Sequence, residues 1–163
     1  MPGPPKLHEL PDYAELRCFS NFTFLTGASR PEELVLRASQ LGYKALAITD
    51  ECSMAGIVRA HVAAKQARLK LLLGAQFRVE GDGAFVLTVL ACNLNGYGNL
   101  CEFITGLRRS SEKGSYRLAQ GGVRGTDLLD CVVLVSPGRG FTSEQLRRLG
   151  RWTLQQFTGR CWF

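Results

Sequence analysis

The feature that most constrains the fold is an alternation of short, unbroken apolar segments with amphipathic helical ones. Ala45–Thr49 is an apolar run of strand length, Lys70–Phe77 has the same character one helical segment later, and Glu15–Phe19 precedes both. Strands that are buried on both faces have continuous apolar sequences, and a helix between two strands indicates parallel pairing with a right-handed crossover. The pattern therefore predicts β-α-β-α-β in the first half of the chain, and with it an α/β sheet or barrel.

Local signals predict where the two intervening helices begin and end. Ser29 and Glu32 fit a capping box, in which the serine oxygen accepts from a backbone N–H and the glutamate reaches back. Gly42 is placed to end this helix because glycine adopts a positive φ easily. The second helix is predicted over Ser53–Arg68, where apolar side chains recur at helical spacing.

The second half of the chain departs from this alternation. Gly81–Gly83 predicts a hairpin turn, so the strand Phe85–Ala91 is expected to run antiparallel to its predecessor. A helix is expected over Asn99–Arg109, after a loop-to-helix turn at Gly96–Asn99 that lacks the lysine of a phosphate-binding loop. The remaining expected elements are a loop over Ser110–Thr126, a strand over Cys131–Val135, a helix capped by Thr142 and Gln145, and a strand from Arg160.

Length and composition indicate one globular domain. The chain has 163 residues, of which 45% are hydrophobic and 21% are charged. Its longest apolar runs, such as Phe85–Cys92, have about eight residues, whereas a bilayer span needs roughly 20. Met1–Leu10 lacks the charged-then-apolar pattern of a secretory leader. We therefore expect a cytoplasmic protein without membrane contact, with an irregular lead-in over residues 1–12 and one domain over residues 13–163.

The spacing of the six cysteines does not indicate a metal site. The sequence has no C-x-x-C pair, and His8 and His61 are its two histidines. Structural zinc needs clustered thiolates or imidazoles. Four cysteines lie in or beside predicted strands, where cysteine usually serves as a small buried apolar side chain: Cys18, Cys92, Cys131 and Cys161. We expect no metal, and we interpret His61 as an ordinary surface or core residue.

The net charge of +6 is unevenly distributed. Residues 1–105 carry ten basic and ten acidic side chains, whereas residues 106–163 carry ten basic and four acidic ones. This excess suits contact with a polyanion or an acidic partner, and it equally suits a solvated helix face. The candidate contact residues are Arg108, Arg109, Arg147, Arg148 and Arg151.

Collinear motifs around the predicted strand ends carry a family resemblance. Chemistry in parallel α/β folds gathers at the carboxyl ends of strands, which here are Arg17–Phe19, Thr49–Glu51 and Gly74–Gln76. The motifs are YAEL at 13–16, SNFTFL at 20–25, GAS at 27–29, PEEL at 31–34, LGY at 41–43, AITDECS at 47–53, GIVRAH at 56–61, GYGNLC at 96–101 and GSYRL at 114–118. Together they resemble the PHP (polymerase and histidinol phosphatase) domain at the N-terminus of C-family bacterial DNA polymerase α subunits, most closely the error-prone branch.

The resemblance implies a vestigial metal site. In active PHP domains the three strands end in His-x-His, Thr-Asp-His and Gly-x-Glu, which hold metal ions that activate water for phosphoester hydrolysis. Here the corresponding residues are Arg17, Phe19, Glu51 and Gln76, and only Asp50 is retained. Arg17 and Phe19 offer no lone pair to a metal. We therefore expect no metal cluster, no catalytic residue, and no phosphoesterase or proofreading nuclease activity.

An internal ion pair is the expected replacement for the metal. We predict that Arg17 pairs with Asp50 or Glu51 across the strand ends, because a charge-assisted hydrogen bond would satisfy both partners. Asp50 alone is then structural and not catalytic. No serine has an identifiable histidine and aspartate companion, so a nucleophilic triad is not predicted.

By this resemblance the fold is an incomplete, distorted β/α barrel of PHP type, similar to a TIM barrel, with parallel strands and an inserted hairpin. The implied function is that of a catalytically inactive PHP portion and scaffold of an error-prone DNA polymerase in damage-induced mutagenesis and translesion synthesis. The chain itself would need no cofactor, and the parent polymerase would use Mg²⁺. The implied partners are the rest of the polymerase chain, DNA through the parent enzyme, and other mutagenesis or replication proteins.

A function of a different class stays open. The basic second half also suits a stand-alone nucleic-acid-binding or protein-docking module. The last segment, Cys161–Phe163, would leave an apolar strand edge without a covering helix. We therefore expect further chain or a partner to cover that edge.

Overall fold

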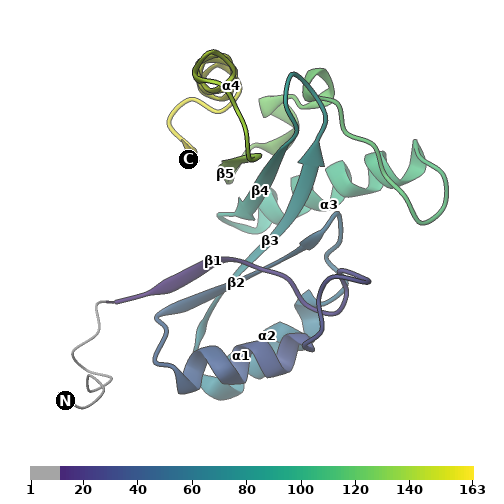
Figure 1. Cartoon of the computed structure of the whole chain (residues 1–163). Coiled ribbons are helices and arrows are strands. Elements are labelled where there is room, and N and C mark those ends of the chain that lie inside the picture. The colour runs from purple at the N-terminus through teal and green to yellow at the C-terminus, as the bar shows by residue number, and fades with distance from the viewer. Residues whose placement is uncertain (1–11) are drawn as a thin grey trace.

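The computed structural model describes residues 12–163, in which six strands form one curled sheet flanked by helices (Figure 1). The strands are β1 (Ala14–Cys18), β2 (Ala45–Glu51), β3 (Lys70–Val79), β4 (Phe85–Ala91), β5 (Cys131–Pro137) and β6 (Cys161–Trp162). The helices are α1 (Pro31–Gln40), α2 (Ile57–Ala67), α3 (Leu94–Arg109) and α4 (Ser143–Gln156), with short 3₁₀ turns η2 (Gln120–Gly122) and η3 (Gly125–Leu128). The lead-in expected over residues 1–12 lies outside the described residues, apart from Asp12.

Strands that follow one another in the sequence are neighbours in the sheet, in the order β1-β2-β3-β4-β5-β6. The β1–β2 and β2–β3 pairs are parallel, the β3–β4 and β4–β5 pairs are antiparallel, and β5–β6 is parallel again. The sheet curls into half a barrel, with β1 and β6 as its outer strands (Figure 1). The predicted α/β class, the incomplete barrel and the inserted hairpin are confirmed.

Two apolar clusters fill the two halves of the molecule. In the first, α1 and α2 pack on β2, and Val35, Ile48 and Ala60 are fully buried. In the second, Phe77 and Phe157 lie among residues of β3, β4, β5, α3 and α4. Figure 1 shows this division, with α1 and α2 together along the β1–β3 half and α3 across the β3–β5 half. The carboxyl end of β2 at Glu51 pairs with Gln76 inside β3, which continues to Val79 and pairs there with the start of β4.

The first helix begins one residue later than predicted. Its N-cap is Arg30, whose backbone N–H donates to Glu33 Oε2 at 2.8 Å, so the predicted cap at Ser29 is wrong. Pro31 explains the shift, because its fixed φ suits the first helical position and it has no N–H to satisfy. Gly42 follows the helix with a φ of 75°, which confirms the predicted helix end.

The third helix begins five residues earlier than predicted, at Leu94. The Asn93 side chain caps it by accepting from the Gly96 N–H at 2.9 Å, so the expected loop-to-helix turn lies inside the helix. A Cβ on Gly96 would lie 2.1 Å from the Asp130 carbonyl oxygen, so glycine is needed for the helix to approach this backbone. Two glycines lower the helix propensity of this segment, and the sequence alone therefore placed the helix start too late.

The other predicted elements are found with shifted ends. The helix expected over Ser53–Arg68 spans Ile57–Ala67, and the strand expected from Arg160 covers only Cys161–Trp162. The Thr142–Gln145 capping box of α4 is confirmed, since Gln145 N donates to Thr142 Oγ1 at 3.2 Å. Among the described residues, none of the helices is long and apolar enough to cross a bilayer.

Candidate functional site

The carboxyl ends of β1 and β2 and the adjoining part of β3 bring four of the five predicted site positions to one pocket. Gln76 was predicted at the end of a strand and lies inside β3, which continues to Val79. Glu51 of β2 and Gln76 of β3 are register partners, and Arg17 comes from the end of β1. Together with Phe19 they line a pocket of about 330 Å³ that the ends of β4 and β5 complete. Asp50 does not line this pocket, because its side chain points away from it into the fold and is only 1% exposed.

The Asp50 carboxylate is held by three hydrogen bonds from one loop. Oδ1 accepts from the Ser20 backbone N–H and from the Thr23 hydroxyl, both at 2.7 Å, and Oδ2 accepts from the Ser20 hydroxyl at 2.8 Å. Ser20 is fully buried and Thr23 is 5% exposed. A buried carboxylate needs such donors because it has left its hydration shell. Asp50 therefore fastens the loop after β1 to the end of β2.

The Glu51 carboxylate has a different pair of partners. Its Oε1 forms an ion pair with Arg78 Nε at 3.1 Å and accepts from the Tyr116 hydroxyl at 2.9 Å. The Arg78 backbone N–H in turn donates to the Tyr116 oxygen at 2.7 Å. Burial, and after it the hydrogen bond to Glu51, raises the pKa of Tyr116 above its ordinary value, so the phenol stays protonated and donates. Glu51, Arg78 and Tyr116 form one hydrogen-bonded group.

Arg17 binds Gln76, so its predicted pairing with Asp50 or Glu51 is wrong. Arg17 Nε donates to Gln76 Oε1 at 2.9 Å, across the end of β2. The β1–β2 register shifts between Glu15 and Cys18, so Arg17 lies at an irregular point of the pairing. The Asp50 carboxylate is already satisfied by other donors, and Glu51 Oε1 is engaged by Arg78 and Tyr116.

These residues do not form the ligand set of a metal ion. Arg17 and Phe19 have no lone pair to donate, and the Gln76 oxygen is occupied by Arg17. The Asp50 oxygens already accept three hydrogen bonds. Within residues 12–163, no group of three or more histidine, cysteine, aspartate or glutamate side chains is placed to hold a metal. The metal that the resemblance associates with active PHP domains does not fit here.

Arg108, one of the predicted contact residues, is engaged inside the fold. Its Nε and Nη2 donate to the Cys52 carbonyl oxygen at 3.3 and 3.2 Å, and its Nη1 donates to the Ser115 carbonyl oxygen at 3.2 Å. Its guanidinium also lies over the Tyr116 ring, 5.6 Å from the centroid. These contacts link α3 to the end of β2 and to the loop that carries Tyr116. The sequence analysis did not identify Tyr116 as part of this site.

The other predicted arginines lie on two separate helices. Arg109 ends α3, whereas three arginines of α4 have side chains that are 61–72% exposed. Glu144 lies 3.7, 3.2 and 3.8 Å from these three, which are Arg147, Arg148 and Arg151. Arg148 also contacts Asp82 at 3.0 Å. The basic surface on α4 is therefore partly neutralised by acidic neighbours.

Two of the six cysteines, Cys52 and Cys131, are buried. All six are unpaired by disulfides. Burial raises the pKa of Cys52 and of Cys131 to about 11, so both stay protonated at neutral pH. Of the four strand cysteines that were predicted to be buried, Cys131 is buried, Cys18 and Cys161 are partly exposed, and Cys92 is exposed, so the prediction is wrong for Cys92. His61 is an exposed residue of α2.

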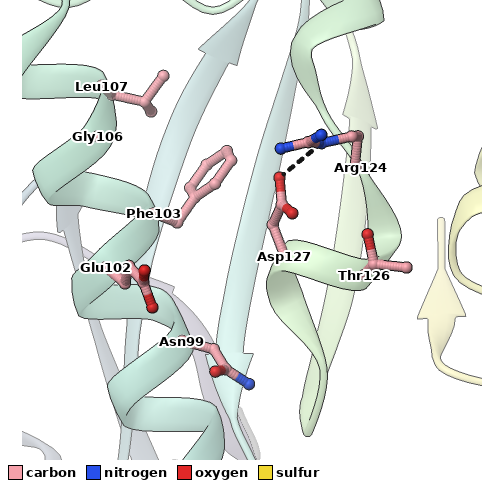
Figure 2. A pocket seen from close by; sticks show the side chains of 8 residues that line it. All are labelled: Asn99, Glu102, Phe103, Gly106, Leu107, Arg124, Thr126 and Asp127. Atoms are coloured by element: carbon pink, nitrogen blue, oxygen red, sulfur yellow. Dashed lines mark hydrogen bonds and ion pairs between the residues drawn. The ribbon is translucent and has the colours of Figure 1, made fainter.

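A second pocket, of about 430 Å³, was not predicted. Figure 2 shows it between α3 and the η3 segment, with Glu102 and Phe103 facing the Arg124–Asp127 ion pair of 3.1 Å. Asn99, also on its α3 side, donates to the Leu129 carbonyl oxygen at 2.9 Å. Its walls come from segments separated along the chain and carry no shared motif, so no sequence signal could have found it.

Comparisons with known proteins agree with the fold and the strand-end motifs. Residues 15–128 match the PHP domain family. The chain is 50% identical over 157 residues to an error-prone DNA polymerase of Dechloromonas aromatica, with 94% of this chain and 15% of that protein covered. It is 62% identical over 112 residues to one of Ralstonia nicotianae, with 67% of this chain and 10% of that protein covered.

A third similar protein is an error-prone DNA polymerase of Bordetella parapertussis, which is 46% identical over 164 residues. The alignment covers 94% of this chain and 16% of that protein, so the chain spans a small part of the length of these relatives. Among solved structures, a Bifidobacterium adolescentis protein assigned as a metal-dependent phosphoesterase superposes with a TM-score of 0.66. It is 16% identical, with 86% of this chain and 74% of that one covered, and this likeness concerns the fold alone.

Proposed function

The chain belongs to the PHP domain family, and on this premise we propose that it is a catalytically inactive PHP portion of an error-prone DNA polymerase. In this proposal the parent enzyme carries out translesion DNA synthesis in the cytoplasm after DNA damage. The parent would bind Mg²⁺ and DNA outside this chain, and this chain would need no cofactor. One observation carries the proposal: at the strand ends, Arg17 and Phe19 have no donor atom for a metal, and the oxygen atoms of Asp50 and Gln76 are engaged by protein groups.

Phosphoester hydrolysis by metal ions needs open ligand positions and an activated water. Arg17 instead places a fixed positive charge at the end of β1, which opposes a divalent cation electrostatically. Its bond to Gln76 occupies the Gln76 oxygen atom, and the bonds from Ser20 and Thr23 occupy both Asp50 oxygen atoms. These contacts support inactivity as a phosphoesterase and as an exonuclease.

The same contacts support a scaffolding role. The Asp50 group fastens the loop after β1, and the Glu51–Arg78–Tyr116 group joins β2, β3 and the segment after α3. Protein hydrogen bonds can therefore hold the strand ends together without a metal. We propose that the outer strands β1 and β6 face the rest of the polymerase chain, since Leu16 is 37% and Trp162 is 53% exposed.

A hydrolysis assay tests the proposed inactivity. The purified chain would be incubated with Mg²⁺, Mn²⁺ or Zn²⁺ and with an aryl phosphate, an aryl phosphodiester or single-stranded DNA. We expect no turnover above that of the buffer, whereas an active metal-dependent phosphoesterase in parallel reactions turns over. Hydrolysis that a chelator abolishes, and that persists through repurification, would contradict the proposal.

Primer extension by the full-length polymerase tests the scaffolding role. A variant with Asp50→Ala is expected to extend primers normally at low temperature and to lose activity at a lower temperature than the unmodified enzyme. The physical reason is that the substitution removes bonds within the PHP portion and touches no catalytic group of a polymerase. A loss of the extension rate at low temperature, with the enzyme still folded, would show a direct part in synthesis and contradict a purely scaffolding role.

A nucleic-acid interface on α4 is the second candidate. The exposed side chains of Arg147, Arg148 and Arg151 favour it, and their shared neighbour Glu144 weakens it. Phosphate contacts release counterions, so this candidate requires an affinity for DNA that falls steeply with added salt. Replacing the three arginines with glutamine should then reduce the slope of log K against log salt. An unchanged slope would remove the candidate.

A further inference from the structure

The start of β3 forms an open edge inside the sheet. β4 pairs with β3 only from Gly74 onwards, so the four residues Lys70–Leu73 precede this pairing and have β2 as their strand neighbour. After β4 the chain turns away from β3, because the Cys92 N–H donates to the Asp130 carbonyl oxygen at 2.9 Å and Asn93 then caps α3. Within residues 12–163, no strand therefore lies along the other side of this part of β3.

Leu71 is the residue whose backbone faces this open side. Neighbouring residues of a strand direct their N–H and C=O groups to opposite sides. The Gln76 carbonyl oxygen accepts from the Cys52 N–H on the β2 side, and the β2–β3 register is regular, so even-numbered residues of β3 face β2 and Leu71 faces away from it. In the part of the chain that the structure describes, the Leu71 N–H and C=O have no hydrogen-bond partner. Backbone groups are usually paired, so this edge can accept a further strand.

A groove of about 600 Å³ runs along the same edge. All four residues of Lys70–Leu73 line it, and successive side chains of a strand point to opposite faces of the sheet, so the groove lies beside the strand and not over one face. Its walls carry apolar side chains from two helices, Val58 of α2 and Leu94 of α3, which are 71% and 83% exposed. Exposed apolar groups that gather in one groove mark an interaction surface.

The charge at this groove is positive. Lys70 lines it, together with His61 of α2. Lys65 and Arg68, at and just after the end of α2, are also exposed. Among the described residues, no aspartate or glutamate lines the groove. A partner with an acidic residue beside Lys70 would therefore be complementary in charge.

We propose that the start of β3 docks an extended segment of another protein by strand addition. The segment pairs its backbone with Leu71, places apolar side chains in the groove between α2 and α3, and carries an acidic residue beside Lys70. A strand suits this edge better than a helix, because the backbone groups of a helix interior are already bonded to one another. This surface is separate from the strand-end pocket, and the docking depends neither on a scaffolding role nor on a polymerase parent.

Amide hydrogen exchange of the whole chain, followed by nuclear magnetic resonance, tests the pairing. The probe is a capped peptide, Asp-Val-Thr-Val-Thr-Val-Asp, which has an acidic residue at both ends and therefore suits either strand direction. We expect saturable binding with a dissociation constant on the order of 0.1 mM, and exchange of the Leu71 N–H that is about tenfold slower at saturation. The same peptide N-methylated at its central amides should not bind, because it cannot donate. Equal binding of the two peptides, an unchanged Leu71 exchange rate in the complex, or no saturable binding at roughly 2 mM would overturn the proposal.

Variants at the groove locate the binding site. Val58→Asp should weaken peptide binding about tenfold, because it places a charge in the apolar wall. Val62→Asp is the matched control, since Val62 is an exposed residue of the same helix and does not line the groove, and equal losses would overturn the proposal. Lys70→Glu should weaken binding of the probe about threefold or more and favour a peptide with lysine at both ends. Absence of this reversal would overturn the acidic character of the partner.

A concentration series of the chain alone distinguishes another protein from a second copy of this chain. A monomer in sedimentation, whose Leu71 N–H exchanges rapidly until the peptide is added, supports the proposal. A dimer that forms as the concentration rises, with the Leu71 N–H protected in the absence of peptide, would show that a second copy occupies the edge and would overturn the proposal.

Discussion

Removing the Asp50 carboxylate should destabilise the chain more than any other single change at the strand ends. Asp50→Ala leaves three donors without an acceptor: the Ser20 backbone N–H and the hydroxyls of Ser20 and Thr23. The N–H cannot turn to another acceptor, and an unsatisfied buried donor costs about 1–3 kcal/mol. The hydroxyls can rotate and cost less, and removal of a buried charge offsets part of the loss. We expect a net loss of about 3 kcal/mol in the free energy of unfolding.

Thermal and urea unfolding, followed by circular dichroism, measure this loss. For a chain of this size a loss of about 3 kcal/mol lowers the melting temperature by roughly 6–12 °C. Asp50→Asn is the matched control, because its amide oxygen can still accept from the Ser20 N–H and the Thr23 hydroxyl, and it should cost about half as much. A reversed order of the two variants, or a loss below about 1 kcal/mol for Asp50→Ala, would refute the reasoning. An increase in the free energy of unfolding with either variant would indicate that the Asp50 charge is not fully compensated by its three hydrogen bonds.

Three other changes test the packing and the titration of buried groups. Gly96→Ala should lower the free energy of unfolding by about 2 kcal/mol or more, because the new Cβ would lie 2.1 Å from a backbone oxygen. Gly98→Ala, whose Cβ would have nothing within 4 Å, should raise it by about 0.5 kcal/mol. Urea unfolding compares the two variants, and equal effects would contradict the close approach at Gly96. Burial raises the pKa of Cys131 from 9.0 to about 11, so the stability that the protonated thiol contributes is complete below pH 9 and is lost as the pH rises towards 11. Cys131→Ala should make the free energy of unfolding depend less on pH in this range. An unchanged pH dependence would contradict this prediction. Tyr116→Phe should cost about 1–2 kcal/mol through the lost bond to Glu51, measured by the same unfolding assay, and a neutral effect would show that Glu51 is satisfied by Arg78 alone.

Much of the architecture was predictable because its signals are local. The apolar run of β2 needs only its own composition to indicate a strand buried on both faces, and its burial confirms this. The Thr142–Gln145 capping box and the turn at Gly81–Gly83 likewise depend on a few adjacent residues. The starts of α1 and α3 were misplaced because Pro31 and Asn93 competed as local signals, and because Gly96 serves a contact with a distant segment.

The candidate site was predicted in its residues and not in its bonds. Four of the five predicted positions, on β2, on β3 and at and after the end of β1, line one pocket, as neighbouring parallel strands allow, and Asp50 does not. The partner of Arg17 could not be predicted, because Gln76 is 59 residues away and the β1–β2 register shifts next to Arg17. Tyr116, which lies 65 residues from Glu51, had no motif to mark it as a member of the group.

The sequence by itself determined which chemistry the strand ends can offer. The residue type alone determines whether a side chain has a lone pair for a metal, a fixed charge or a planar set of donors. Arg17 and Phe19 therefore cannot bind a metal ion in any fold of this chain. Only the tertiary structure decided how the remaining polar groups are satisfied. A buried donor or acceptor takes the partner that other segments bring within about 3 Å. In this fold Asp50 accepts hydrogen bonds from the loop after β1, and Glu51 binds Arg78 and Tyr116. Arg17 and Arg78 line one pocket.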